Sequence, residues 1–371
     1  MMEATLYWQL VHSHTVLAHL RNTLTLEDFC QQLRIFWQQP DISNERLLKI
    51  LHLGNSQYIW PDLTIFCAFW SPAEYDSKQR VLTWIPGKDK PLLPFYSEHI
   101  CMLRGQLLAA LIQPKTLLSD IVSFSKQLPK VQPSGFIFHL SRCGSTLVSR
   151  SYARLERCRV LSESPLLTQL LLDPTLDVEQ KSVALKLCIN LQGRLYGEEQ
   201  HLIIKWNAWD LQFWPQIRML YPEVPVLLLI RNPVEIMASQ QKLTGFHMVR
   251  HLMSGWFPEL QMLSANTSIF SYQCAVLRLL LQHSVNVSGQ SGVMILDYKN
   301  LLPAISVDVA AWFSLNLSLE EIQILTQSQK LHSKGLNQIF VPDTQEKQHF
   351  FSAQQKQQIL NSCEQLYSLF K

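Results

Sequence analysis

Several features that would assign this 371-residue sequence to a familiar class of proteins are missing from it. Its eight cysteines form no C-x-x-C pair and follow no regular spacing, so they suit reduced thiols better than a disulfide framework or a structural zinc site. No apolar run reaches the ~18 residues that a membrane-spanning helix requires. The N-terminal segment MMEATLYWQL lacks the basic start of a secretory signal. We therefore expect a cytoplasmic protein without a membrane span.

A strong excess of one charge is also absent. The 32 Lys and Arg residues nearly balance the 29 Asp and Glu residues, which leaves a net charge of +3, and no run rich in Lys or Arg occurs. This balance argues against a basic surface that binds nucleic acid, so any affinity for anions must come from a few individual side chains. The 47% content of hydrophobic residues is ample for a large core. We expect a globular protein of one large or two smaller domains.

The chain changes character near residue 130. Before it, apolar spacing predicts helices at 26–37, 45–53, 97–111 and 115–126, and aromatic and β-branched runs predict strands at 58–70 and 81–85. A proline-rich linker covers 129–135. These patterns predict a mixed α+β N-terminal domain over 1–130, in which no catalytic constellation is found, and a second domain over 131–371.

Short apolar strands alternate with long helical segments in the second domain. Strands are predicted at 136–140, 158–163, 201–206, 224–230 and 292–298. This alternation favours an α/β fold with a five-stranded parallel sheet flanked by helices. Ligands of such sheets bind beyond the carboxyl ends of the strands, so the residues there are the candidates for chemistry. They are Arg142, Glu163, Lys205, Arg231 and Asp297.

The segment GFIFHLSRCGSTLVSR, residues 135–150, predicts a strand, a tight polar loop and a helix. Gly144 allows a close turn, and the first amides of the helix lack partners within it, so the loop is suited to hold a phosphate or sulfate group. Arg142 adds a positive charge, and Ser145 and Thr146 add hydroxyl donors. The lysine of the G-x-x-x-x-G-K-[ST] pattern is missing, and neither G-K-S nor G-K-T occurs in the chain. The other interpretation is an ordinary polar turn before a capped helix.

A second segment, VLLLIRNPVEIMAS, places Arg231 at the end of a buried strand. Pro233 suits the first turn of the following helix, and Ser239 lies eight residues after Arg231, about two turns along. By itself this segment equally fits an arginine that caps the sheet edge and a serine on a solvated helix face.

Together the two segments resemble the signature motifs of sulfotransferases that use 3′-phosphoadenosine 5′-phosphosulfate (PAPS). The resemblance covers residues 135–371 and implies a P-loop-like domain with strand order 2-3-1-4-5, PAPS as co-substrate and no metal. It also assigns cofactor-binding roles. The loop Arg142-Cys143-Gly144-Ser145-Thr146 would hold the 5′-phosphosulfate, Arg231 and Ser239 the 3′-phosphate, and Lys334-Gly335 would belong to a C-terminal cofactor loop.

The resemblance further implies a catalytic group made of Arg142, Lys205 and Glu163. Lys205 matches a lysine beside the transferring group. The cytosolic branch of the family carries its catalytic histidine two residues later, where this chain has Asn207, which cannot take a proton at neutral pH. Glu163 resembles the glutamate base of other branches, although it also fits a carboxylate that only pairs with Lys205 or Arg142. His139, or a histidine of the segment 247–251, is the next candidate for the base.

Other functions stay open at this level. The strand ending in Asp297 resembles a magnesium-binding Walker-B strand, which would suit a P-loop kinase or another NTP-dependent phosphotransferase. A non-catalytic nucleotide-binding protein is the third alternative. His247 and His251 have the spacing of a zinc-protease helix, but Met248 replaces its glutamate, which disfavours that class. The acceptor would be a small or conjugated molecule, and the aromatic-rich stretches 206–214 and 244–256 are candidates to line its site.

Overall fold

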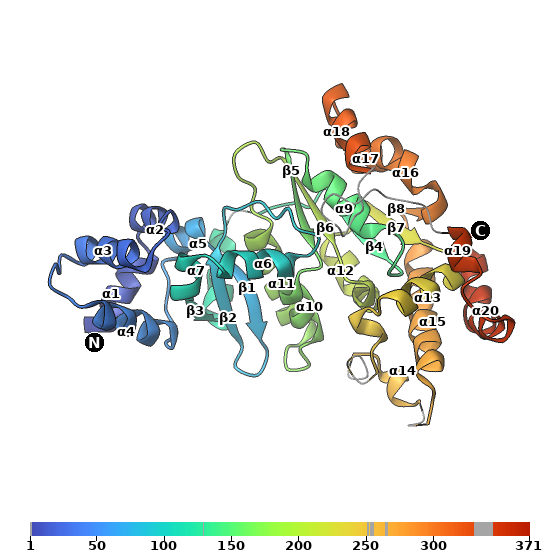
Figure 1. Cartoon of the computed structure of the whole chain (residues 1–371), viewed down its shortest axis with the longest axis horizontal. Coiled ribbons are helices and arrows are strands. Elements are labelled where there is room, and N and C mark those ends of the chain that lie inside the picture. Colours follow the sequence, from blue (N-terminus) through green and yellow to red (C-terminus); the bar gives the residue numbers. More distant parts are fainter. Residues whose placement is uncertain (1, 129, 251, 253–255, 264–265, 330–343) are drawn as a thin grey trace. The chain divides into compact units, whose positions relative to one another are not determined.

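The structure, a computed structural model, describes residues 2–128, 130–250, 252, 256–263, 266–329 and 344–371 (Figure 1). The chain forms two compact units: Met1–Gln132 with Ser164–Gly197, and Pro133–Glu163 with Glu198–Lys371. The sequence predicted a single boundary, after residue 130, and that division stays a prediction. The compact units differ from it in placing Ser164–Gly197 with the N-terminal part. No helix within the described ranges is both long and apolar enough to cross a bilayer.

The first unit combines helices with a small antiparallel sheet. Its strands pair in the order β1-β2-β3. They are β1 (Trp70–Asp76), β2 (Val81–Pro86) and β3 (Lys115–Leu117). The helices are α1 (Met2–Val11), α2 (His14–Arg21), α3 (Leu26–Trp37), α4 (Asn44–Asn55), α5 (Leu63–Phe69), α6 (Tyr96–Arg104), α7 (Leu107–Leu111), α8 (Leu118–Ser123), α10 (Pro165–Leu172) and α11 (Val178–Gln192).

Two predictions for this unit were wrong, one because a local capping signal outweighed propensity and one because of tertiary pairing. The stretch 58–70, predicted as a strand, contains helix α5, whose start is fixed by Asp62: its side chain accepts hydrogen bonds from the amides of Thr64 and Ile65. The stretch 115–126, predicted as one helix, begins with β3, whose residues pair with β2. Only tertiary pairing decides the second case, since three residues carry no period of their own.

The second unit is built on a parallel sheet with the strand order β5-β6-β4-β7-β8. Counted from β4, this is the predicted order 2-3-1-4-5. The strands are β4 (Gly135–His139), β5 (Cys158–Ser162), β6 (His201–Lys205), β7 (Val226–Ile230) and β8 (Val293–Asp297). Every residue of β4, β5 and β7 is buried, as expected for strands covered on both faces.

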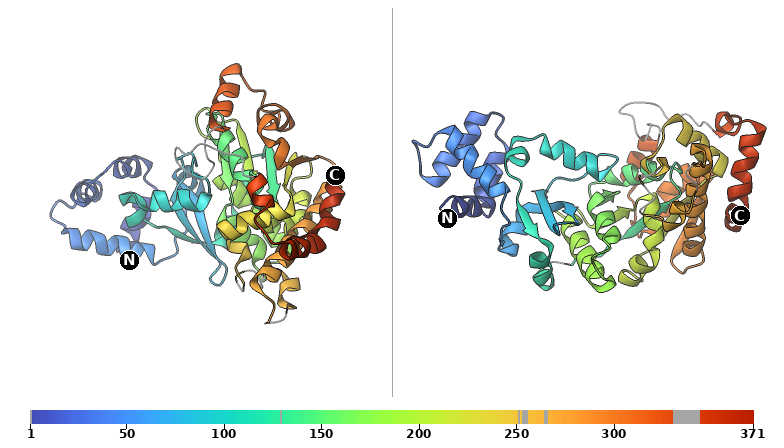
Figure 2. Two further views of the ribbon diagram at one scale, coloured as in Figure 1. Left: turned by 45° about the vertical axis from the view of Figure 1, so that its right-hand side comes forward. Right: turned by 90° about the horizontal axis from the view of Figure 1, so that it is seen from below.

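The unit contains helices that flank this sheet and others that pack on those helices (Figure 2). They are α9 (Ser145–Ala153), α12 (Trp214–Leu220), α13 (Pro233–Lys242), α14 (Pro258–Gln261), α15 (Ile269–Ser288), α16 (Leu301–Ala304), α17 (Ala310–Trp312), α18 (Leu319–Gln329), α19 (Thr344–Gln348) and α20 (Ala353–Tyr367). The predicted α/β fold with a five-stranded parallel sheet and a separate mixed α+β part is confirmed.

The register of the strands brings three polar side chains to one edge of the sheet. Lys205, the last residue of β6, is paired with Ser162 of β5 on one side and with Ile137 of β4 on the other. Glu163 and His139 follow these two partners within two residues. The carboxyl ends of β5, β6 and β4 therefore meet where the first predicted loop begins.

Candidate functional site

The loop between β4 and α9 has an unusual backbone. Ser141, Arg142 and Gly144 have φ angles of 67°, 51° and 82°. This left-handed region is unfavourable for side chains other than glycine, so the surrounding structure must hold the first two residues in place. Gly144 is also sterically required, since a Cβ atom there would lie 2.3 Å from Leu301 Cδ2. The sequence predicted the tight turn at this glycine but not the strain at Ser141 and Arg142.

The turn exposes a row of backbone donors. Within the described part of the chain, no carbonyl accepts a hydrogen bond from the amides of Arg142, Cys143 or Gly144. Successive N–H groups in such a conformation, followed by a helix N-terminus, form a concavity that attracts anions. Ser145 and Thr146, the first residues of α9, are buried beside it.

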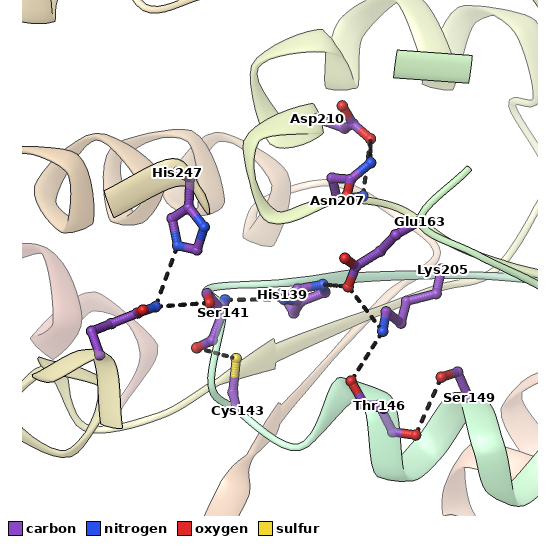
Figure 3. Close-up of polar contacts among 11 residues, drawn as sticks. His139, Ser141, Cys143, Thr146, Ser149, Glu163, Lys205, Asn207, Asp210 and His247 are labelled. Carbon is purple, nitrogen blue, oxygen red and sulfur yellow. Dashed lines mark hydrogen bonds and ion pairs between the residues drawn. The ribbon is translucent and has the colours of Figure 1, made fainter. Parts of the chain in front are cut away.

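Lys205 and Glu163 form an ion pair next to this loop (Figure 3). The two atoms, Lys205 Nζ and Glu163 Oε1, are 2.9 Å apart, and the Lys205 side chain has no exposed surface. The same amine donates a hydrogen bond to Thr146 Oγ1 at 3.2 Å. A buried cation is thus held between a carboxylate and the first turn of α9.

His139 lies on the other side of Glu163. Its Nε2 is 3.4 Å from Glu163 Oε1, and its Nδ1 accepts a hydrogen bond from the Ser141 amide at 3.0 Å. Figure 3 shows the imidazole between the loop and the carboxylate. Because Nδ1 is the acceptor, the proton of the neutral ring is on Nε2, which lies near Glu163 but makes no hydrogen bond among the described residues.

These contacts determine the protonation of the group. Burial raises the pKa of Glu163, but Lys205 and His139 together outweigh burial and lower it to about 2. Burial lowers the pKa of His139, which keeps the imidazole neutral. Burial also raises the pKa of the Cys143 thiol to about 12, so Cys143 offers its amide rather than a thiolate. The loop therefore presents a neutral thiol and a neutral imidazole beside an ionised carboxylate.

Arg142 and Arg231, the two arginines predicted to bind anions, are engaged within the protein. The half-buried Arg142 guanidinium donates to the Leu243 carbonyl. Arg231 is buried, pairs with Glu235 Oε2 at 2.8 Å and donates to the Arg142 carbonyl at 3.1 Å. Its guanidinium also lies 3.8 Å from the centre of the Tyr298 ring.

Ser239 is buried one turn after Glu235 and donates a hydrogen bond to the Glu235 carbonyl at 3.0 Å. Ser239 and Arg231 thus approach the same turn of α13. Glu235 was not predicted as a partner of Arg231; the two residues are four apart, but Arg231 precedes α13, so the spacing rule for ion pairs on a helix does not apply.

A second polar network at this edge was also missed. Gln240, fully buried on α13, donates to Ser141 Oγ at 3.1 Å, and its Nε2 lies 3.4 Å from His247 Nε2. Its Oε1 accepts a hydrogen bond from the Gly245 amide at 2.7 Å. No sequence signal marks a lone glutamine, so only the structure links it to the loop.

The other predicted residues have different positions. Asn207 begins a 3₁₀ helix (Ala208–Phe213), and its backbone amide donates to Asp210 Oδ2 at 2.9 Å. Asp297 accepts hydrogen bonds from the Lys299 amide and from the Tyr367 hydroxyl. Lys334 and Gly335 lie outside the described residues, as does His251. Among the described residues, no group of three or more His, Cys, Asp or Glu side chains is arranged to hold a metal ion.

No protein-family model and no curated protein matches the chain. Several solved structures are similar to it. A sulfotransferase from Alicyclobacillus acidocaldarius is 14% identical, with a TM-score of 0.34 over 62% of this chain and 95% of that one. A sulfotransferase from Mycobacterium avium is 10% identical, with a TM-score of 0.43 over 88% and 97%. The sulfotransferase domain of the Synechococcus PCC 7002 olefin synthase is 14% identical, with a TM-score of 0.34 over 65% and 96%. This similarity concerns the fold and carries no statement about activity.

Proposed function

We propose that the second unit transfers a sulfuryl group from PAPS to a hydroxyl or amine of an acceptor. The observation that carries this proposal is the fully buried Lys205 amine, which is bonded to Thr146 beside a turn whose amides have no carbonyl partner among the described residues. A cation and a row of N–H donors at one point favour an anionic group there.

The reaction would break the bond between sulfur and the 5′-phosphate oxygen and form a bond from sulfur to the acceptor oxygen or nitrogen. Adenosine 3′,5′-bisphosphate leaves, and the acceptor loses a proton. A sulfuryl group carries less negative charge than a phosphoryl group, so Lys205, Arg142 and the loop amides can stabilise the transition state as positioned donors. The hydroxyls of Ser145 and Thr146 would orient the phosphosulfate.

Glu163 is the proposed acceptor of the proton. With a pKa of about 2 it is ionised at neutral pH but only weakly basic. A weak base acts efficiently only where the proton leaves late or where a neighbouring cation moves away. Lys205 supplies such a change in the proposed mechanism: attraction of its amine to the incoming donor would weaken its contact with Glu163 and raise the basicity of the carboxylate.

Arg231 and Ser239 are the proposed contacts of the 3′-phosphate. Arg231 follows β7 directly and Ser239 lies within α13, one turn after Glu235, and Arg231 is already bonded to the loop through the Arg142 carbonyl. Because Glu235 pairs with the same guanidinium, a bound phosphate would compete with this carboxylate for Arg231. Lys334 and Gly335 remain proposed members of the same cofactor site.

Titration calorimetry tests the donor. Adenosine 3′,5′-bisphosphate should bind without magnesium, and more tightly than ATP with or without it. Tighter binding of ATP with magnesium would favour a phosphotransferase and contradict the proposal.

Turnover is tested by following release of adenosine 3′,5′-bisphosphate from PAPS with a panel of alcohols, phenols and amines. Glu163→Gln should lose at least ~100-fold in turnover while it binds the bisphosphate as the wild type does. Bisphosphate binding without transfer to any acceptor of the panel would favour a non-catalytic nucleotide-binding protein.

A further inference from the structure

His139 places its two ring nitrogens beside polar groups on opposite sides, and among the described residues only Nδ1 makes a hydrogen bond. Nδ1 accepts the hydrogen bond of the Ser141 amide at 3.0 Å, and Nε2 lies 3.4 Å from Glu163 Oε1. The residue is only 5% exposed, so solvent does not compete strongly for either nitrogen. A neutral imidazole combines an acceptor and a donor on one rigid ring, which suits a link between an amide and a carboxylate.

This link completes a chain of contacts around the loop. It runs from the Ser141 amide through His139 to Glu163, and then through Lys205 to the Thr146 hydroxyl. Ser141 and Thr146 enclose the loop residues whose amides have no carbonyl partner in the described part of the chain. Both His139 and Lys205 approach Oε1 of Glu163, which leaves Oε2 for the proton of an acceptor.

We propose that His139 is a positioning residue with two separate tasks. Its Nδ1 holds the Ser141 amide and with it the strained conformation of the donor-binding loop. Its Nε2–H orients Glu163 toward the acceptor. This inference rests on the proposed function, because it assigns the loop to the sulfuryl donor and Glu163 to the acceptor.

Two substitutions separate these tasks. Asparagine places an oxygen where Nδ1 accepts, but it is too short to reach Glu163, whereas glutamine can place an amide donor near Nε2. We expect His139→Asn to bind adenosine 3′,5′-bisphosphate within about two-fold of the wild type and to lose ~10-fold or more in turnover. We expect His139→Gln to show the reverse, with turnover at saturating donor within a few-fold and affinity lowered ~10-fold.

A measurement without ligand checks the loop directly. Hydrogen exchange of the segment 140–147 should accelerate in His139→Gln, which frees the Ser141 amide, and stay close to wild type in His139→Asn. His99→Asn is a matched control, because His99 is 2% exposed on α6 of the other unit and should alter neither loop exchange nor turnover.

The outcomes separate the two proposals. Parallel losses of affinity and turnover in both His139 variants, or equal loop exchange in both, would show that His139 is only a packing residue. A wild type that binds no adenosine 3′,5′-bisphosphate would refute the proposed function, and loop exchange would still decide whether His139 holds Ser141.

Discussion

Replacing Glu163 with glutamine removes the negative charge that lies 2.9 Å from the buried amine of Lys205. The side chain keeps its size, so the change isolates the charge. Lys205 has no exposed surface, and removal of one partner of a buried ion pair is costly because the other charge stays desolvated. We therefore expect Glu163→Gln to lower the free energy of unfolding and to change how it depends on pH.

The size of the effect follows from the pKa of Glu163. A carboxyl whose pKa falls from 4.5 to about 2 on folding stabilises the folded state by about 3 kcal/mol at pH 7, at ~1.4 kcal/mol per pKa unit. Since the folded pKa is depressed, this stabilisation is present above pH 4.5 and is lost as the pH falls toward 2. At pH 3 about 1.4 kcal/mol should remain.

Urea unfolding followed by circular dichroism at pH 7, 4.5 and 3 measures this difference. The other unit contributes equally to the free energy of unfolding of wild type and variant, so its contribution cancels in the difference. Glu74→Gln is a suitable control, since the partly exposed pair of Glu74 and Arg104 should contribute only about 0–1 kcal/mol. The reasoning would be refuted if the difference in free energy of unfolding between wild type and Glu163→Gln stayed constant from pH 7 to pH 3 or became larger on acidification.

Other predictions concern the loop and the 3′-phosphate. Gly144→Ala should lower the free energy of unfolding in urea by at least ~2 kcal/mol, because φ at this position is 82° and the new Cβ would lie 2.3 Å from Leu301. Gly197→Ala is the control: φ is 57° but the space around it is open, so the free energy of unfolding should fall by only ~1 kcal/mol. Arg231→Lys should lower the affinity for adenosine 3′,5′-bisphosphate ~10-fold or more in calorimetry, since lysine cannot bond in a fork, and Ser239→Ala should cost less; an unchanged affinity in Arg231→Lys would exclude that contact. Adenosine 5′-phosphosulfate, which lacks the 3′-phosphate, should bind more weakly than PAPS to the wild type and equally to wild type and Arg231→Lys; a loss for this ligand in the variant would mean that Arg231 contacts another group.

The sequence predicted the sheet and the edge that carries the candidate site. Buried parallel strands are continuous apolar runs, so the five strands and the parallel sheet were accessible from local patterns. The strand order came only from the resemblance of two segments to sulfotransferase motifs. The convergence of Lys205 and Glu163 on one edge followed from the rule that the carboxyl ends of parallel strands meet there. The turn at Gly144 was predictable because a glycine there is a local backbone requirement.

Which of these charged groups pair with one another depended on the tertiary structure. Arg231 and Glu163 were predicted to face a ligand and a substrate, yet their neighbours within the protein are Glu235 for the first, and Lys205 with His139 for the second. The strand-end rule places side chains within reach of each other without giving the distances on which charge pairing and pKa values depend.

Tertiary contacts also decided the short elements and the division of the chain. Strand β3 has three residues and forms by pairing with β2, and Ser164–Gly197 belongs with the N-terminal unit although it follows β5 in sequence. Local propensity and period fix long, regular elements, because each residue there repeats the same environment. The short elements and the division into units are fixed by contacts between residues distant in sequence. These contacts stabilise the protein only after folding has brought the residues together, so the sequence does not reveal them.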